Sequence, residues 1–271
     1  MLKFINFYIK SIIIFFIVAT FFLLSTLWYF SIGLPDYKKL SNYQPPISSR
    51  VYSEDGKLIA EYALEKRLFV PFDSVPKKVI DSFLSAEDKN FFNHPGVDAK
   101  GIVRAIIKNI KNISQNKRLE GASTITQQVA KNFLLTSEVS FERKIKEAIL
   151  AIRIERAFSK NQILELYLNE IYLGNNSYGV AAAALNYFDK SLDDLTTIEA
   201  AFLATLPKAP SKYNPKRNYN RTLERRNWVI DKMIENKHIK NQDLKYKLKP
   251  IINMEEYLQE IDLQNLILNH L

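Results

Sequence analysis

Apolar residues form one unbroken run near the amino terminus and become periodic only further along the chain. Residues 11–35 carry no charged side chain, and residues 12–30 are almost wholly Ile, Phe, Leu, Val, Ala and Thr. A helix of about 20 such residues spans the hydrocarbon core of a bilayer. The pattern therefore predicts a transmembrane anchor over residues 11–32, preceded by a short tail of residues 1–10.

The residues that flank this run predict its orientation. Lys3 and Lys10 precede it, which places the amino terminus in the cytoplasm by the positive-inside rule, although Lys38 and Lys39 follow on the other side. A cleaved signal peptide is the alternative interpretation. The run exceeds the roughly 7–15 apolar residues of a signal peptide, and no small-residue cleavage site follows it. We therefore expect an uncleaved anchor and an extracytoplasmic domain.

Residues 33–70 predict a linker followed by a β hairpin. Val51 and Tyr52 belong to one alternating run and residues 58–62 to the next. Asp55-Gly56 lies between them, and this dipeptide favours the tight turns that join hairpin strands.

The spacing of apolar residues becomes helical over residues 71–240, which predicts a mainly α domain. Ser140 is placed to cap a helix that ends near Phe158. Ser159, with Gln162 three residues later, has the spacing of a capping box and begins the next helix.

Three further segments complete the expected organisation. Residues 175–180 begin with Asn175, Asn176 and Ser177 and contain Gly179, which predicts a loop. Leu195 to Leu206 is an apolar helix that Pro207 ends. Residues 241–271 are expected to form a helical carboxy-terminal segment that is cut short before a further domain.

Composition excludes several classes of protein. With 47% hydrophobic and 25% charged residues, the chain is globular. It has no cysteine, which excludes disulfides, thiolate zinc sites and a cysteine nucleophile, and its three histidines are too far apart in sequence to predict a metal cluster. The net charge of +9 fits nucleic acid, anionic lipid or a phosphorylated substrate. The chain has no zinc-finger or RNA-binding signature, so we expect no nucleic-acid partner.

Glu87-Asp88 is a candidate for proton transfer. Phe91, Phe92 and His94 follow the pair closely. A surface helix end is the ordinary interpretation of two adjacent acidic residues. Aromatic neighbours can instead desolvate a carboxyl group and raise its pKa toward a value suited to a general base.

A cluster of small and hydroxyl residues over residues 121–128 opens another predicted helix. Thr124 and Gln127 alone would satisfy a capping box. The cluster holds more hydrogen-bonding groups than a cap requires, so it is also a candidate site for sugar hydroxyls or a pyrophosphate. Its candidate ligands are Ser123, Thr124, Thr126, Gln127, Gln128 and, one turn later, Lys131.

Arg143, Lys144 and Glu147 form a third candidate cluster. Arg143 and Glu147 are four residues apart, so an exposed ion pair is the ordinary expectation. Two apolar lines on the same helix predict instead that most of its circumference is buried, with Glu147 and its cations at the rim. The first line is Glu147, Ala151, Ile154 and Phe158, and the second is Phe141, Ile145, Ala148 and Ile152.

Residues 102–111 mix Ile and Val with Arg and Lys. This composition is typical of a helix that lies in the membrane interface, and equally of an ordinary amphipathic core helix. The sequence leaves both interpretations open.

Five blocks of residues, in order along the chain, resemble the five motifs of the family 51 glycosyltransferases, which polymerise lipid II. The blocks are Glu87 to Gly96, Gly121 to Gln128, Arg143 to Glu147, Lys160 to Asn169 and Arg225 to Ile230. Each block alone is unspecific, whereas five in this order after one anchor are specific. The resemblance covers residues 71–239, and its departures, Ala122 and Ile230, touch no reactive group.

The resemblance implies a fold, a reaction and a set of roles. The fold would be mainly α, a lysozyme-like helical glycosyltransferase domain with a small β hairpin, preceded by one transmembrane helix. The reaction would form β-1,4-linked glycan with inversion at C1 and release undecaprenyl pyrophosphate. Glu87 would be the base, and Glu147 would act with the nearby cations on the departing pyrophosphate. The implied substrate-binding residues are Asp88, Phe91, His94, Ser123, Thr124, Thr126, Gln127, Gln128, Lys131, Arg143 and Lys144.

The resemblance also implies partners and a location. The partners would be lipid II, the growing glycan chain, the membrane and other cell-wall synthesis proteins, at a bacterial plasma membrane that the chain crosses once. We expect no required cofactor or metal, although a divalent cation, Mg or Mn, could assist at the pyrophosphate. The anchor, the hairpin and residues 206–215 resemble the amino-terminal part of class A penicillin-binding proteins of the 1A type.

Two other interpretations stay open. A lysozyme-like lytic enzyme would cleave glycan with one catalytic Glu and would need no basic pyrophosphate site. A non-catalytic membrane-anchored fragment is the second, because the chain stops early whereas class A proteins continue into a transpeptidase, whose motifs are incomplete here. Ser74 and Lys77, and Ser114 and Lys117, have the Ser-x-x-Lys spacing without the companion motifs. We expect no transpeptidase activity within these residues.

Overall fold

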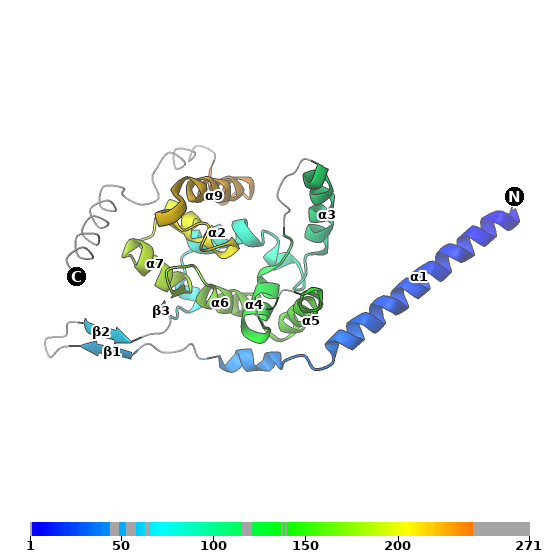
Figure 1. Ribbon diagram of the computed structural model, residues 1–271, viewed down its shortest axis with the longest axis horizontal. Coiled ribbons are helices and arrows are strands. Elements are labelled where there is room, and N and C mark those ends of the chain that lie inside the picture. Colours follow the sequence, from blue (N-terminus) through cyan, green and yellow to red (C-terminus); the bar gives the residue numbers. More distant parts are fainter. Residues whose placement is uncertain are drawn as a thin grey trace.

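One long helix projects from a cluster of shorter ones, and a small β hairpin lies toward the opposite side (Figure 1). The computed structural model describes residues 2–43, 49–52, 58–62, 66–114, 121–136, 138 and 140–240. The prediction of a mainly α chain with a small β element is confirmed. The predicted turn at Asp55-Gly56 and the predicted segment 241–271 lie outside the described residues.

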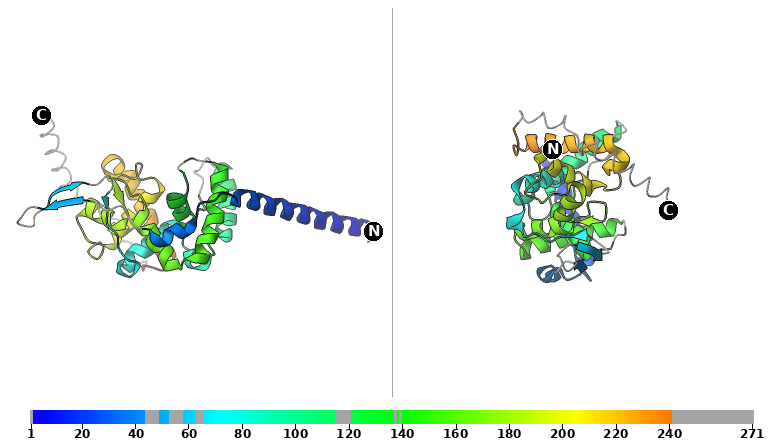
Figure 2. Two further views of the ribbon diagram at one scale, coloured as in Figure 1. Left: turned by 90° about the horizontal axis from the view of Figure 1, so that it is seen from below. Right: turned by 90° about the vertical axis from the view of Figure 1, so that its left-hand side faces the viewer.

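The projecting helix, α1 (Leu2–Ser31), contains the predicted anchor. Its stretch Phe7–Ser31 is 25 residues long, and the most apolar window of that stretch has no buried share. At 1.5 Å per residue, a helix of this length can cross a bilayer. Figures 1 and 2 show that it points away from the rest of the chain.

The chain that follows α1 is attached to the helical domain. It forms a 3-10 helix, η1 (Tyr37–Asn42), in which Leu40 is buried. The Tyr43 hydroxyl donates a hydrogen bond to Glu170 at 2.6 Å, and the Tyr43 ring meets the edge of Phe133 with 4.7 Å between centroids. The segment between anchor and domain is therefore part of the fold.

Among the residues that the structure describes, four short strands form two separate pairs. β1 (Ser49–Tyr52) and β2 (Leu58–Tyr62) pair antiparallel, as the hairpin prediction required. β3 (Lys66–Arg67) pairs parallel with β4 (Ser177–Tyr178). The prediction of an irregular loop over residues 175–180 is therefore wrong in part. A strand of two residues has no periodicity, and its partner lies more than 100 residues earlier in the chain.

The described part of the domain contains eight further helices. They are α2 (Lys77–Glu87), α3 (Ala99–Ser114), α4 (Ile125–Leu134), α5 (Phe141–Ala157), α6 (Lys160–Glu170), α7 (Val180–Phe188), α8 (Thr197–Leu203) and α9 (Pro215–Glu235). A short 3-10 helix, η2 (Phe72–Ser74), precedes α2, and two others, η3 (Phe91–Asn93) and η4 (Leu206–Lys208), lie between helices.

The predicted helix starts are confirmed. Ser140 caps α5, and Ser159 forms a capping box with Gln162 at the start of α6. Thr124 forms the third predicted cap, a box with Gln127. The helix predicted from Leu195 to Leu206 is shorter than expected. Thr196 caps α8, the helix ends at Leu203, and the chain then forms η4, which contains Pro207.

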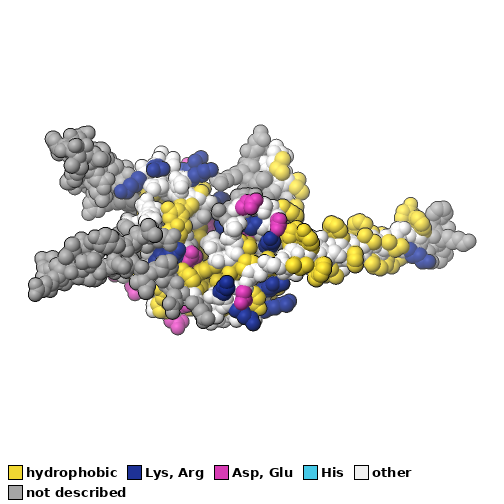
Figure 3. All heavy atoms as spheres, turned by 60° about the horizontal axis from the view of Figure 1, so that its bottom comes forward, with side chains coloured by type: hydrophobic (Ala, Val, Ile, Leu, Met, Phe, Trp, Pro, Cys, Tyr) yellow, Lys and Arg dark blue, Asp and Glu magenta, His cyan; other side chains and the backbone are white. Residues whose placement is uncertain are grey.

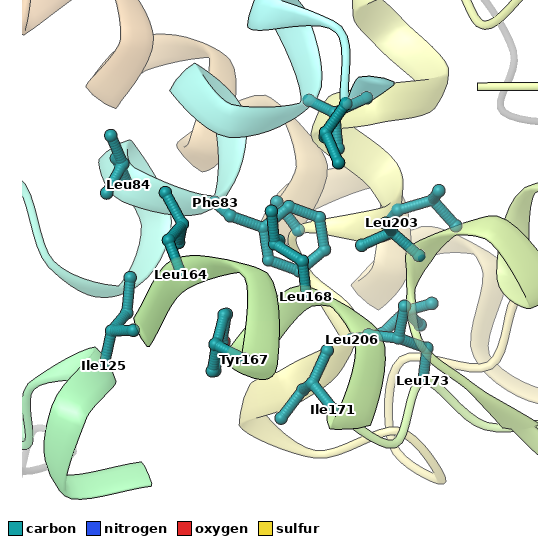
Figure 4. Close-up of a cluster of buried hydrophobic side chains, with 14 of the residues drawn as sticks. Phe83, Leu84, Ile125, Leu164, Tyr167, Leu168, Ile171, Leu173, Leu203 and Leu206 are labelled. Atoms are coloured by element: carbon teal, nitrogen blue, oxygen red, sulfur yellow. The ribbon is translucent and has the colours of Figure 1, made fainter. Parts of the chain in front are cut away.

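The core is built around α6 (Figure 4). Its residues Ile163, Leu164, Tyr167 and Leu168 are at most 1% exposed. Helices α4, α5 and α7 pack on α6, and α2 meets it where the centroids of the Phe83 and Tyr167 rings lie 6.2 Å apart. Full burial of a large apolar side chain stabilises a fold by about 1.5–3 kcal/mol. The core thus holds the ends of α2 and α4, where the candidate residues lie.

The prediction for α5 is half right. Its first apolar line is buried, with Ala151 and Ile154 at 0% exposure. Its second line is not, because Phe141 is 82% and Ile152 38% exposed. One side of α5 packs on α4, and α1 contacts α5 as well, so the helix lies at the edge of the domain.

The apolar stripe of α3 faces outward. Val103, Ile106, Ile107, Ile110 and Ile113 are each between 55% and 66% exposed. The alternative in which this segment is an ordinary core helix is therefore wrong. In Figures 1 and 2, α3 lies at the end of the domain from which α1 projects, and Figure 3 shows apolar side chains on α1 and on this end of the domain.

Candidate active site

Glu87 is the last residue of α2. The helix ends there because Asp88 has a non-helical backbone, with φ −157° and ψ 76°. The Glu87 carboxylate accepts a hydrogen bond from the Gln128 side-chain amide on α4 at 2.9 Å. One oxygen is thus fixed by the protein while the side chain stays partly exposed to a cavity on each side.

Burial raises the pKa of the Glu87 carboxyl above its ordinary value. The Gln128 hydrogen bond and the positive charges of Arg225 and Lys208 act in the opposite direction without cancelling it. The sequence predicted this direction from neighbouring aromatic rings. Phe92 does not supply the burial, because it is 51% exposed.

Asp88 points inward and fastens the following loop to α4. Both of its oxygens lie 3.0 Å from His94 Nε2, and one also accepts the Ile125 N–H at 3.0 Å. The Gly96 N–H donates to His94 Nδ1 at 3.2 Å, so the ring carries its proton on Nε2 and donates it to Asp88. A carboxylate is favoured at this helix start by the dipole of α4.

A second set of contacts closes the loop from the other side. Lys160 Nζ donates to the His94 carbonyl at 2.7 Å and lies 4.4 Å from the centre of the Phe91 ring. The same ammonium pairs with Glu155 at 2.7 Å, and Glu155 also accepts the Thr126 hydroxyl at 2.5 Å. Phe91, His94 and Thr126 are therefore buried supports of the loop that follows Glu87.

Two cavities meet at Glu87. The α5 cavity has a volume of about 580 Å³ and the α3 cavity about 330 Å³. Both are lined by Ala86, Glu87, Gly121, Ser123 and Trp228. The cations of the α5 cavity are Lys131, Arg143, Lys144, Lys208 and Arg225. Those of the α3 cavity are Lys89, Arg104, Lys108 and Lys232.

Glu147 lies beneath the α5 cavity. Its side chain is 1% exposed and pairs with Arg143 at 3.1 Å and with Lys144. Lys144 also donates to the Ser123 hydroxyl at 2.8 Å. The sequence placed Glu147 at the rim with its cations. The structure buries Glu147 and leaves only the cations at the rim, because residue 147 falls on the line of α5 that packs inward.

The structure separates the predicted site residues into two groups. Those on the cavity walls are Glu87, Ser123, Gln127, Gln128, Lys131, Arg143, Lys144 and Glu147 on the α5 side, with Asp88 and Thr124 on the α3 side. Phe91, His94 and Thr126 line neither cavity. Within the described residues, no three His, Asp or Glu side chains are grouped to hold a metal ion.

Sequence reasoning missed several residues on the cavity walls. Lys208 and Arg225 face the α5 cavity, and Arg104 and Lys108 face the α3 cavity. Trp228 faces both. The sequence placed Arg225 in the fifth block of residues without assigning it a role. Arg104 and Lys108 are four residues apart and so share one face of α3, but their spacing does not show what that face meets.

Comparison with known proteins assigns the family. A family model for transglycosylases matches residues 55–234. The chain belongs to the transglycosylase family. The match spans α2 to nearly the end of α9, so it includes both cavities of this transglycosylase domain.

The relatives of this transglycosylase domain are bacterial. It is 56% identical to penicillin-binding protein 1A of Rickettsia typhi over 83% of this chain and 29% of that protein. It is 51% identical to penicillin-binding protein 1A of Rickettsia bellii, over 96% of this chain and 33% of that protein. A crystal structure of penicillin-binding protein 1A from Haemophilus influenzae matches with 29% identity and a TM-score of 0.44, over 84% of this chain and 25% of that one. The chain thus spans about a third or less of the length of these relatives.

Proposed function

We propose that this transglycosylase domain polymerises lipid II into β-1,4-linked glycan strands for the cell wall. The observation that carries the proposal is the position of Glu87, a carboxyl group with a raised pKa at the junction of two cation-lined cavities. One substrate would supply the attacking hydroxyl and the other a sugar linked to pyrophosphate. A base that lies between two cavities lined by cations could contact both of these substrates at once.

Glu87 would act as the general base. It removes the proton from the 4-hydroxyl of the acceptor sugar while that oxygen attacks C1 of the donor. The donor linkage is α and the product is β, so the attack inverts C1 in one step, and base and leaving group stand on opposite faces of the sugar. A carboxyl group whose pKa is raised toward the working pH is a better base than one at its ordinary value.

The α5 cavity would hold the departing pyrophosphate. Lys131, Arg143 and Lys144 line it, and charge-assisted hydrogen bonds from such groups stabilise the charge that develops on a leaving phosphate. Glu147 would keep Arg143 and Lys144 in place from below. A divalent cation, Mg or Mn, could assist there, and no step requires it.

The α3 cavity would hold the acceptor. Its lining holds the cations Lys89, Arg104, Lys108 and Lys232 beside the carboxylates Asp88, Asp98 and Glu235. The cations would meet the pyrophosphate of a second substrate. A lytic enzyme binds one neutral glycan and has no use for cations on both sides of its catalytic carboxyl group. This second cavity therefore favours synthesis over lysis.

The exposed apolar surfaces support a membrane-bound substrate. α1 is long enough to anchor the chain, and the outward stripe of α3 lies at the same end of the domain. We infer a single-pass protein of the bacterial plasma membrane with a cytoplasmic amino terminus and an extracytoplasmic domain. Lipid II, the growing glycan chain and other cell-wall synthesis proteins would be its partners.

The test is polymerisation of purified lipid II by the wild-type protein and by Glu87→Gln. Glutamine keeps the shape of the side chain but cannot accept the proton, so we expect the rate to fall by about 10²- to 10⁴-fold. Glu224→Gln is the matched control, since Glu224 is an exposed residue of α9 that lines neither cavity. Equal rates for wild type and Glu87→Gln would refute the proposal, and cleavage of preformed glycan without polymerisation would replace it with the lytic function.

A further inference from the structure

Trp228 stands in the wall that the two cavities share. It lies on α9 and contributes to the lining of both the α5 and the α3 cavity. The guanidinium carbon of Arg225, one turn earlier, is 3.7 Å from the centre of one of its rings. Lys232, one turn later, has its ammonium 5.8 Å away. All three residues lie on one face of α9, since they are three and four residues apart.

Arg225 needs a support if its charge is to act at one place. Its side chain has several rotatable bonds, and ordering such a side chain costs up to about 2 kcal/mol of conformational entropy. A tryptophan face is the best aromatic partner for a cation. A stacked guanidinium keeps its N–H donors at its edge, so they point in the plane of the group and can meet an anion there.

We propose that Trp228 is a positioning residue that holds Arg225 by stacking, so that the guanidinium faces the α5 cavity across from Glu87. The inference rests on the proposed function, because the anion that Arg225 would meet is the pyrophosphate of the donor. Trp228 itself makes no bond to the reacting atoms. Its contribution is the direction in which Arg225 points.

The charge of Arg225 is one of several that act on Glu87. Lys208 on η4 acts in the same direction, and Asp88 at the end of α2 in the opposite one. Gln128 on α4 donates a hydrogen bond to Glu87. Burial raises the pKa of the Tyr167 hydroxyl on α6, and the negative charge of Glu87 raises it further. Lys131, Arg143, Lys144 and Glu147 lie further along the same cavity.

These charges give the proposal a readout in pH. Arg225 lowers the pKa of Glu87, against the larger effect of burial. If Arg225 is replaced or moves away from Glu87, its positive charge no longer counteracts the effect of burial, and the pKa of Glu87 rises. A base with a higher pKa stays protonated to higher pH. In the plot of kcat/KM against pH, the acid limb, where activity rises as the base loses its proton, therefore moves to higher pH.

The experiment compares lipid II polymerisation across pH in the full chain for wild type, Trp228→Leu, Trp228→Phe, Arg225→Gln and the double variant Trp228→Leu/Arg225→Gln. We expect Trp228→Leu to lower kcat/KM by about 3- to 30-fold, the range that a cation–π contact supports. Its acid limb should move to higher pH, as in Arg225→Gln. Trp228→Phe keeps an aromatic face and should stay near wild type. The double variant should match Arg225→Gln alone.

Two outcomes would overturn the proposal. The first is an acid limb for Trp228→Leu at the same pH as in wild type. The second is a loss of kcat/KM in the double variant that equals the product of the two single losses. A purely structural role would lower the melting temperature without moving the limb. Absence of polymerisation by the wild type would refute the proposed function instead. In that case, quenching of Trp228 fluorescence by acrylamide tests the stacking contact directly. Trp28→Phe leaves Trp228 as the one tryptophan, and adding Arg225→Gln should increase its quenching, whereas equal quenching would contradict the contact.

Discussion

The surroundings of the Glu87 carboxyl favour its protonated form, and this affects stability as well as the proposed base catalysis. Because burial raises its pKa in the folded chain, the folded state binds this proton more tightly than the unfolded state does. The stability linked to Glu87 is therefore fully present below the ordinary pKa of the carboxyl and is lost as pH rises through the raised value. Glu87→Gln should unfold at higher denaturant concentration than wild type at neutral pH.

That gain should disappear in acid, where the wild-type carboxyl is also neutral. Urea unfolding of both proteins at neutral and at acidic pH measures it. A constant difference between them at all pH values would show that the charge of Glu87 is not its source.

Gly96 is a position where no side chain fits. Its φ is +94°, and an added Cβ would lie 2.6 Å from the Ala151 carbonyl oxygen of α5. Gly96→Ala must therefore shift the loop that carries His94, and we expect a loss of about 1–3 kcal/mol in the free energy of unfolding. Gly121→Ala is the control, because nothing lies within 4 Å of its added Cβ. Equal losses in denaturant unfolding would contradict this account.

Two acidic residues of α5 provide a matched pair. Glu147 is buried and pairs with Arg143 and Lys144 at the rim, while Glu142 pairs with Lys146 at 2.6 Å on the exposed side. Glu147→Gln removes the charge that pairs with the two cations and leaves a buried amide in its place, so we expect a loss of about 1–3 kcal/mol of stability. Glu142→Gln should cost less than about 0.5 kcal/mol. Chemical denaturation measures the loss in the free energy of unfolding for each variant. A larger loss for Glu142→Gln than for Glu147→Gln would contradict the assignment.

At the scale of single residues, the sequence does not distinguish residues that line the candidate site from residues that are buried in the fold. Arg225 and Arg226 are adjacent and identical in type, yet Arg225 faces the α5 cavity and Arg226 is fully buried. Their difference is one step of about 100° around α9. Only the position of α9 against α2 decides which arginine meets Glu87.

At the scale of helices and strands, local signals predicted the starts of α4, α5 and α6 because a cap is made within four residues. The pairing of β3 with β4 and the outward side of α5 were not predictable in this way. Both depend on segments that are distant in sequence. The apolar line that includes Phe141 has the same period as a core-facing line, and only the packing of the whole chain shows that it is exposed.

The stripe of α3 leads to a prediction about membrane binding. In a chain that lacks residues 1–32, the double substitution Ile107→Ser and Ile110→Ser should weaken binding to lipid vesicles by about tenfold or more, because two apolar side chains lose their insertion. Vesicle co-sedimentation measures this. Leu185→Ser is the control, since Leu185 is 46% exposed on α7. Equal effects of the two changes would argue against a membrane contact at α3.

At the scale of the whole molecule, the order of the five motifs along the chain was enough to predict one site, but not its division into two cavities. That division arises because the end of α2 meets α4 and α5 on one side and α3 on the other, with α9 behind. The distances between these helices follow from how the core around α6 is filled. No motif contains that information.

The attachment of residues 37–43 to the domain limits how far the domain can move from its anchor. Only residues 32–36 lie between α1 and η1, and a segment of that length reaches at most about 18 Å when extended. With α1 in a bilayer, as proposed, a domain held this close would stay within reach of molecules that diffuse in the membrane plane. Its encounters with them would then be a search over a surface instead of a volume, and the rate of supply would depend on the area density of the proposed lipid substrate and on its lateral diffusion.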